Sequence, residues 1–244
     1  MRKFLVVLVL ACFLTPLISA QNDAKPDAPA STPAPAPEPN TKASGRVEAA
    51  GTVLDEIQNA PDNRIPEEIL GSAECVAVVP SLLNGGFVFG GRYGRGVASC
   101  RTEKGWSAPA FFMIGGGSFG LQIGGQATDV VMLIMNKGGM DHLLSSKFKV
   151  GGDASAAAGP VGRHAAADTD WKMRAQVLTY SRSRGLFAGL ELNGAVIKQD
   201  KDSTRDFYGR MVPFKTSLKG EVEPPKASYP FLSTLAKWAQ VASK

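Results

Sequence analysis

The stretch MIGGGSFGLQIGGQATDVVMLIMN, from Met113 to Asn136, decides the fold class, because glycines separate short apolar runs within it. The same punctuation occurs upstream, in CVAVVP (residues 75–80) and GGFVFGGRYGRGVASC (residues 85–100). Apolar, β-rich runs bounded by glycine pairs are typical of strands that turn back on one another. The sequence therefore predicts a predominantly antiparallel, partly barrel-like sheet.

Two enzyme motifs overlap in this stretch. Gly115, Gly117 and Gly120 match the G-x-G-x-x-G of a dinucleotide-binding turn, and Gly116, Ser118 and Gly120 match the G-x-S-x-G of a hydrolase nucleophile elbow. Each motif requires a helix directly after it. The sequence LQIGG that follows predicts another strand instead. We interpret the glycines as strand features, with a serine hydrolase using Ser118 as the minor alternative.

Metal and cofactor chemistry has no support in the spacing of the polar residues. The chain has only two histidines, His142 and His164, and neither C-x-x-C nor H-E-x-x-H is present. Structural and catalytic metal sites normally show such spacing. We therefore expect no metal site and no cofactor.

Helices are expected at both ends of the sheet. Apolar residues recur at helical spacing in residues 46–59, and Ile65-Pro66 begins a second short segment with two glutamates in its first turn. The tail YPFLSTLAKWAQVASK (residues 229–244) has the pattern of an amphipathic helix. The predicted fold class is α+β, with N-terminal helices and a C-terminal amphipathic helix around the sheet.

The N-terminus has the pattern of an export signal. Arg2 and Lys3 precede an apolar run, and small residues end at Ala20, so residues 1–20 are expected to be a signal peptide cleaved after Ala20. A membrane anchor or lipidation at Cys12 are the alternatives. Residues 21–45 are expected to form a Pro/Ala-rich disordered linker, and residues 46–244 the single folded domain. We expect a periplasmic, envelope or secreted protein.

The net charge that matters is that of the mature chain, after removal of the expected signal peptide. Without the two basic residues of the signal peptide, the chain has 25 basic and 22 acidic residues, and this excess of positive charge is too small to indicate nucleic-acid binding.

Cys75 and Cys100 flank a glycine-rich segment that would fold back as a hairpin. In an oxidising compartment they form a disulfide bond, or else remain two buried thiols.

Residues 171–200 are expected to form two long strands joined near Arg184-Gly185. Trp171, Met173 and Ala175 alternate with cations, so one face would pack in the core and the other would carry positive charge.

Four motifs resemble the SYLF domain, a lipid-binding family: GWSAPAFF (residues 105–112), GGSFGLQIGGQATDVVMLIMN (116–136), AAGPVGR (157–163) and YSRSRGLFAGLELNGAVI (180–197). The resemblance covers roughly residues 50–214 and implies a non-catalytic, phospholipid-binding module. Eukaryotic members bind phosphoinositides and other anionic phospholipids, and some yeast members bind actin. An exported protein would not meet actin, so the expected ligand is an anionic phospholipid or membrane surface.

Lysine and arginine are the residues that hold anionic headgroups. The candidate lipid-binding set comprises Lys147, Lys149, Arg163, Lys172, Arg174, Arg182 and Arg184. A solvated sheet face is the alternative interpretation of this row. The N-terminal helix lacks a basic face and is expected to pack on the sheet. A structural or protein-interaction module of the bacterial envelope is the alternative function.

Overall fold

The computed structural model describes residues 41–60, 64–86, 89–119, 124–161, 175–183, 186–189 and 192–240. The helices in these ranges are α1 (Lys42–Gln58), α2 (Glu67–Ser72), α3 (Lys137–Leu144), α5 (Lys201–Tyr208), α6 (Phe214–Leu218) and α7 (Tyr229–Trp238), with a short 3-10 turn at Lys226–Ser228. The strands are β1 (Cys75–Gly86), β2 (Phe89–Thr102), β3 (Gly105–Trp106), β4 (Ala110–Phe119), β5 (Gly124–Ile134), β6 (Lys147–Lys149), β7 (Ala156–Ala158), β8 (Val177–Ser183), β9 (Leu186–Gly189) and β10 (Val196–Gln199).

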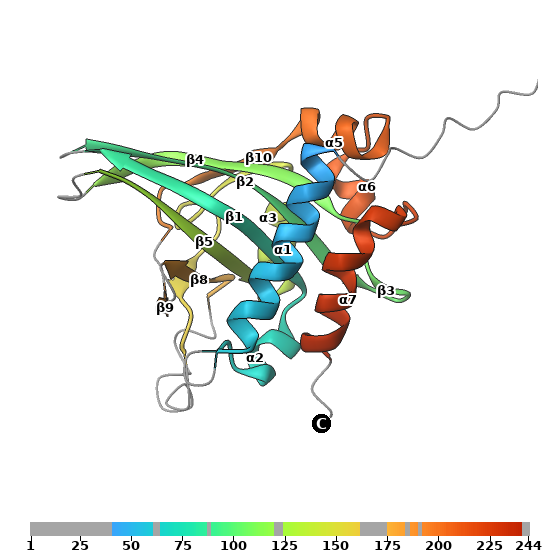
Figure 1. Cartoon of the computed structure of the whole chain (residues 1–244), viewed down its shortest axis with the longest axis horizontal. Coiled ribbons are helices and arrows are strands. Elements are labelled where there is room, and N and C mark those ends of the chain that lie inside the picture. Colours follow the sequence, from blue (N-terminus) through green and yellow to red (C-terminus); the bar gives the residue numbers. More distant parts are fainter. Residues whose placement is uncertain are drawn as a thin grey trace, which may run out of the picture. The chain divides into compact units, whose positions relative to one another are not determined.

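The described strands form one ten-stranded sheet, curled into a half-barrel (Figure 1). The order is β6-β10-β4-β2-β1-β5-β8-β7, while β3 pairs with β2 and β9 pairs with β8. Every pairing is antiparallel except that of β7 with β8. Helices from both ends of the chain pack beside the sheet, so the predicted α+β class is confirmed.

The terminal helices occur close to where the sequence indicated them. The α1 helix begins at Lys42, ahead of the expected Arg46, because the Thr41 hydroxyl accepts a hydrogen bond from the Ser44 amide and caps the helix. The closing helix α7 buries Phe231 and Leu235, as its spacing predicts. None of the helices in the described part of the chain is long and apolar enough to cross a membrane.

Apolar clusters pack on both faces of the central strands. On β1, Val76 and Val78 belong to the cluster beneath α1 and α7, whereas Ala77 and Val79 belong to the cluster on the opposite face. The expectation that strand residues 171–182 have a solvated face is wrong for β8, because both faces are covered: Val177, Leu178, Thr179 and Tyr180 are all buried.

The expected second long strand is divided into two. The hairpin between β8 and β9 is present, with Ser183 paired to Leu186. Gly194 adopts a left-handed conformation (φ 83°) in a turn after β9, and β10 then joins the other side of the sheet, between β6 and β4. A left-handed glycine interrupts a strand because the extended backbone cannot continue through it. The alternation of residues in the sequence therefore did not reveal the turn that separates β9 from β10.

Cys75 and Cys100 are directly opposed on β1 and β2 and form a disulfide bond. Both residues are fully buried, on the face away from α1. Of the two alternatives that the sequence left open, the structure has the disulfide.

The close packing of α1 on α7 gives a first prediction. A Cβ atom at Gly51 would lie 2.8 Å from the Pro230 carbonyl oxygen, whereas a Cβ atom at Gly45 on the same helix would have nothing within 4 Å. Gly51→Ala should lower the free energy of unfolding by about 1–3 kcal/mol, because the two helices must move apart. The control Gly45→Ala should raise it by about 0.5–1 kcal/mol through helix propensity. Chemical denaturation measures both values, and equal effects would contradict the close approach.

The disulfide gives a second prediction. It closes a loop with a sequence separation of 25 residues. In the chain-entropy model such a crosslink stabilises the fold by about 3–4 kcal/mol. Replacing both cysteines with alanine should therefore lower the free energy of unfolding by about that amount in urea titrations. Reductant should destabilise the wild type and leave the double variant unchanged; a wild type insensitive to reductant during unfolding would contradict the bond.

Candidate functional site

Helices cover only part of one sheet face. Val97 on β2 and Phe111 on β4 are fully buried in the cluster with α1 and α5. Further along the same face, Tyr93 is 47% exposed and Leu83 on β1 is 55% exposed. Figure 1 shows the ends of β1, β2, β4 and β5 running beyond α1. The uncovered face is defined here by Leu83, Tyr93, Arg95, Met113, Lys147, Lys149, Val196 and Lys198.

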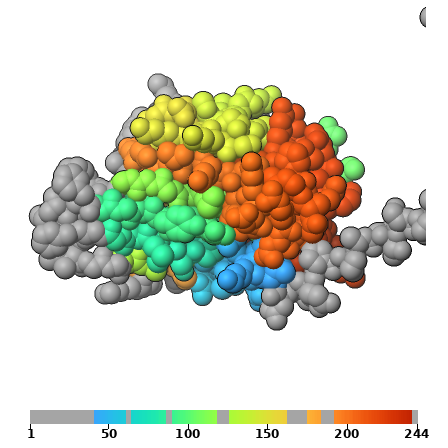
Figure 2. All heavy atoms as spheres, turned by 90° about the horizontal axis from the view of Figure 1, so that it is seen from above, coloured from blue at the N-terminus to red at the C-terminus, as the bar shows by residue number. Residues whose placement is uncertain are grey.

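Cross-strand register gathers cations on the uncovered face. Lys147 on β6 is the partner of Lys198 on β10, Lys198 is the partner of Met113, and Met113 is the partner of Arg95. In Figure 2, β2 and β4 (teal to green), β10 (orange) and β6 (yellow) follow one another across the surface. Residues directly opposed on antiparallel strands share a face. One row of the sheet therefore carries three cations and a methionine.

Within the described part of the chain, the fold does not neutralise the lysines of this face. Lys147, Lys149 and Lys198 are exposed, and among the described residues no carboxylate forms an ion pair with any of their ammonium groups. The Asp153 carboxylate accepts a hydrogen bond from the Lys149 backbone amide. Two like charges directly opposed in a sheet are unfavourable. An anion bound between Lys147 and Lys198 would remove that repulsion.

A hollow of about 430 Å³ lies in the uncovered face. Its lining combines two ammonium groups with apolar side chains and a glycine: Tyr93, Met113, Ile114, Gly115, Lys147, Val196 and Lys198. This lining is complementary to an amphiphile that has a negatively charged group next to an apolar body.

Arg95 borders the hollow and is held in place. Its Nε donates to the Tyr93 hydroxyl at 2.9 Å, and this bond raises the pKa of the guanidinium. Its Nη1 lies 3.3 Å from the carboxylate of Asp200, which is only 1% exposed and caps α5 by accepting from the Ser203 amide. Arg95 therefore orients the tyrosine ring, while its own charge is balanced by Asp200.

Arg182, expected among the lipid-binding cations, lies away from this hollow. It forms ion pairs with Glu56 of α1 and, at 2.9 Å, with Asp129 of β5. Burial acts to lower the pKa of Arg182, but the hydrogen bond to Asp129 and the two carboxylate charges raise it overall. Arg182 thus ties α1 to the sheet.

The other candidates divide into two groups. Lys147 and Lys149 lie on the uncovered face, as described above. Arg163, Lys172, Arg174 and Arg184 lie outside the described residues and stay predictions.

Lys198, Met113 and Tyr93 were not among the predicted site residues. The alternation in VIKQ (residues 196–199) contained a usable signal, since Ile197 is buried and Lys198 is exposed. Its position beside Lys147 depends on the pairing of β10 with β6, which sequence spacing does not determine.

The serine motif is not a nucleophile elbow. The β4 strand continues through Ser118 to Phe119, and Ser118 pairs with Gly90 in a regular ladder. An elbow requires a sharp strand-to-helix turn at the serine. The described backbone at Ser118 has no such turn.

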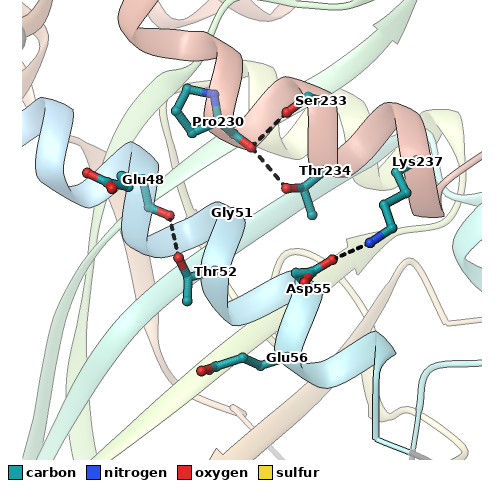
Figure 3. Close-up of a pocket in the computed structure, with 9 residues that line it drawn as sticks. All are labelled: Glu48, Gly51, Thr52, Asp55, Glu56, Pro230, Ser233, Thr234 and Lys237. Atoms are coloured by element: carbon teal, nitrogen blue, oxygen red, sulfur yellow. Dashed lines mark hydrogen bonds and ion pairs between the residues drawn. The ribbon is translucent and has the colours of Figure 1, made fainter.

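A second concavity, of about 510 Å³, lies between α1 and α7 (Figure 3). Glu48, Asp55 and Glu56 line it, against the single cation Lys237. The Asp55 carboxylate accepts from Lys237 at 2.8 Å and from the Trp238 indole at 2.7 Å, and the Lys237 bond lowers the pKa of Asp55. This acidic groove repels anions, so of the two concavities only the hollow suits an anionic ligand.

Comparison with known proteins identifies the family. Residues 115–238, about half of the chain, match the model of the Ysc84 family, described as Las17-binding protein actin regulator. LAS seventeen-binding protein 3 of Saccharomyces cerevisiae is 33% identical over 199 residues, which cover 80% of this chain and 43% of the yeast protein. SH3 domain-containing YSC84-like protein 1 of Mus musculus is 32% identical over 170 residues, covering 69% of this chain and 50% of the mouse protein. The chain thus spans about half the length of these relatives or less, and it belongs to the Ysc84/SYLF family.

Proposed function

We propose that the protein binds anionic phospholipid, without catalysing a reaction, through the uncovered face. The observation that carries this proposal is the cross-strand pair of Lys147 and Lys198, which forms no ion pair with the described carboxylates and lies beside the exposed ring of Tyr93. Each cation near an anionic membrane surface contributes about 1 kcal/mol, so Lys147, Lys149 and Lys198 together would give useful affinity. Tyr93 and Leu83 would add apolar contact at the headgroup level.

An exported, envelope-associated location is part of the proposal. The expected signal peptide supports it, and so does the disulfide between Cys75 and Cys100, because such bonds persist in oxidising compartments.

A protein partner is the second candidate. Relatives are named for binding Las17, and the acidic groove between α1 and α7 offers a separate surface with exposed Glu48 and Thr52. A basic polypeptide segment would fit that charge. Failure of the wild-type protein to float with anionic vesicles would overturn the lipid proposal and favour this alternative.

The lipid proposal is tested by flotation with phosphatidylglycerol vesicles. Lys147→Glu with Lys198→Glu should reduce vesicle binding by about 10- to 100-fold, because two attractive charges become repulsive. Wild-type binding should weaken as salt rises, since exposed charges are screened.

The matched control is Lys104→Glu with Lys219→Glu. It makes the same change in net charge at exposed positions near the other end of β2, where Gly220 approaches Thr102. The control should bind like the wild type. Equal losses in both variants would show a general charge effect and would contradict a site on the uncovered face.

A further inference from the structure

A row of glycines crosses four strands beside the hollow. Gly117 on β4 pairs with Gly91 on β2, Gly91 pairs with Gly85 on β1, and Gly85 pairs with Gly125 on β5. Gly85, Gly91 and Gly117 are exposed. Strands lie about 4.8 Å apart, so this glycine strip is roughly 14 Å long.

The fold itself does not explain Gly85, Gly91 and Gly117. None of the three has the positive φ that would exclude other residues, and a Cβ atom at any of them would meet nothing within 4 Å. By contrast, a Cβ atom at Gly96 would lie 2.5 Å from the Phe112 ring. Glycine weakens a strand interior, and where no bend or internal neighbour requires it, it marks a place where a ligand approaches the backbone.

The strip can accept only certain ligands. Its backbone N–H and C=O groups lie in the plane of the sheet, so they do not point outward from its face. A polypeptide laid across the strands would lose water from its own amides without gaining hydrogen bonds, which is costly. An alkyl chain has no such groups to satisfy, and it would lie flat on the Cα–H surface that the glycines leave open.

The surroundings of the strip give the ligand its polarity. The neighbouring row on the same face contains Gly115, Tyr93, Leu83 and Ala127. The exposed side chains of Tyr93 and Leu83 therefore lie along one side of the strip. Beyond β4, Val196 and then Lys149 continue this row, and Lys198 and Lys147 lie in the next row, which contains Met113.

We propose that the glycine strip holds the alkyl chain of an anionic amphiphile whose headgroup lies at these lysines. This inference rests on the proposed function and adds to it a groove for one chain of the lipid. A single chain in the strip would be recognised by its length as well as by the charge of the headgroup.

The test measures how affinity depends on chain length. Alkyl phosphates of six to twelve carbons, below their critical micelle concentrations, are titrated by calorimetry, with inorganic phosphate as the headgroup alone. Wild-type affinity should rise by about two- to fourfold for each added methylene group that the strip covers. Gly91→Val with Gly117→Val should abolish that rise, because the valine side chains fill the open strip. Gly91→Ala should reduce it, and Gly45→Ala should leave it unchanged.

The valine variant is expected to fold, since the positions are open and valine suits strands; its thermal unfolding should match or exceed that of the wild type. The proposed alkyl groove would be contradicted if affinity rose with chain length as steeply in the folded valine variant as in the wild type. It would also be contradicted if wild-type affinity did not depend on chain length. Vesicle flotation tests the proposed function separately. If Lys147→Glu with Lys198→Glu loses vesicle binding while Gly91→Val with Gly117→Val binds like the wild type, the proposed lipid-binding surface stands and the alkyl groove is rejected.

Discussion

The structure depends on the two-sided burial of its central strands. On β1 and β5, Val76–Val79 and Val130–Leu133 are buried on both faces, so each face needs a cover. A helix of 17 residues such as α1 is about 25 Å long, whereas a strand of 14 residues such as β2 extends for about 45 Å. The strands therefore extend beyond the helix that covers them, and this difference in length leaves the uncovered face.

The chemistry of each strand changes where its cover ends. On the face of β2 that α1 partly covers, the fully buried Val97 is followed by Arg95, Tyr93 and then the exposed Gly91. Covered positions gain stability from apolar burial, and uncovered positions do not. Apolar burial therefore does not determine the residue type at exposed positions beyond the helices, and cations and glycines are tolerated there.

Much of the fold could be predicted from local patterns. Glycine pairs indicated the antiparallel strands, and helical spacing indicated α1, α2 and α7. The cover on β8 was missed because the cations before it suggested a solvated face, although Val177–Tyr180 already lacked the alternation of a one-sided strand. The hollow was only half predicted: Lys147 was expected, but its partner Lys198 comes from a distant segment. Long-range pairing, which no local pattern encodes, creates that site.

The glycines of the motif-like stretch separate into two sets by strand alternation. Gly116 faces the interior, where a Cβ atom would lie 3.1 Å from the Cα atom of Ala195, so internal packing favours a glycine there. Gly117, the next residue, points to the opposite face and meets nothing. Each glycine belongs to a different one of the two motif matches, and both lie within the regular strand β4 instead of a turn. Packing accounts for the glycine that faces the interior, and the open glycine is the one that the proposed alkyl groove would use.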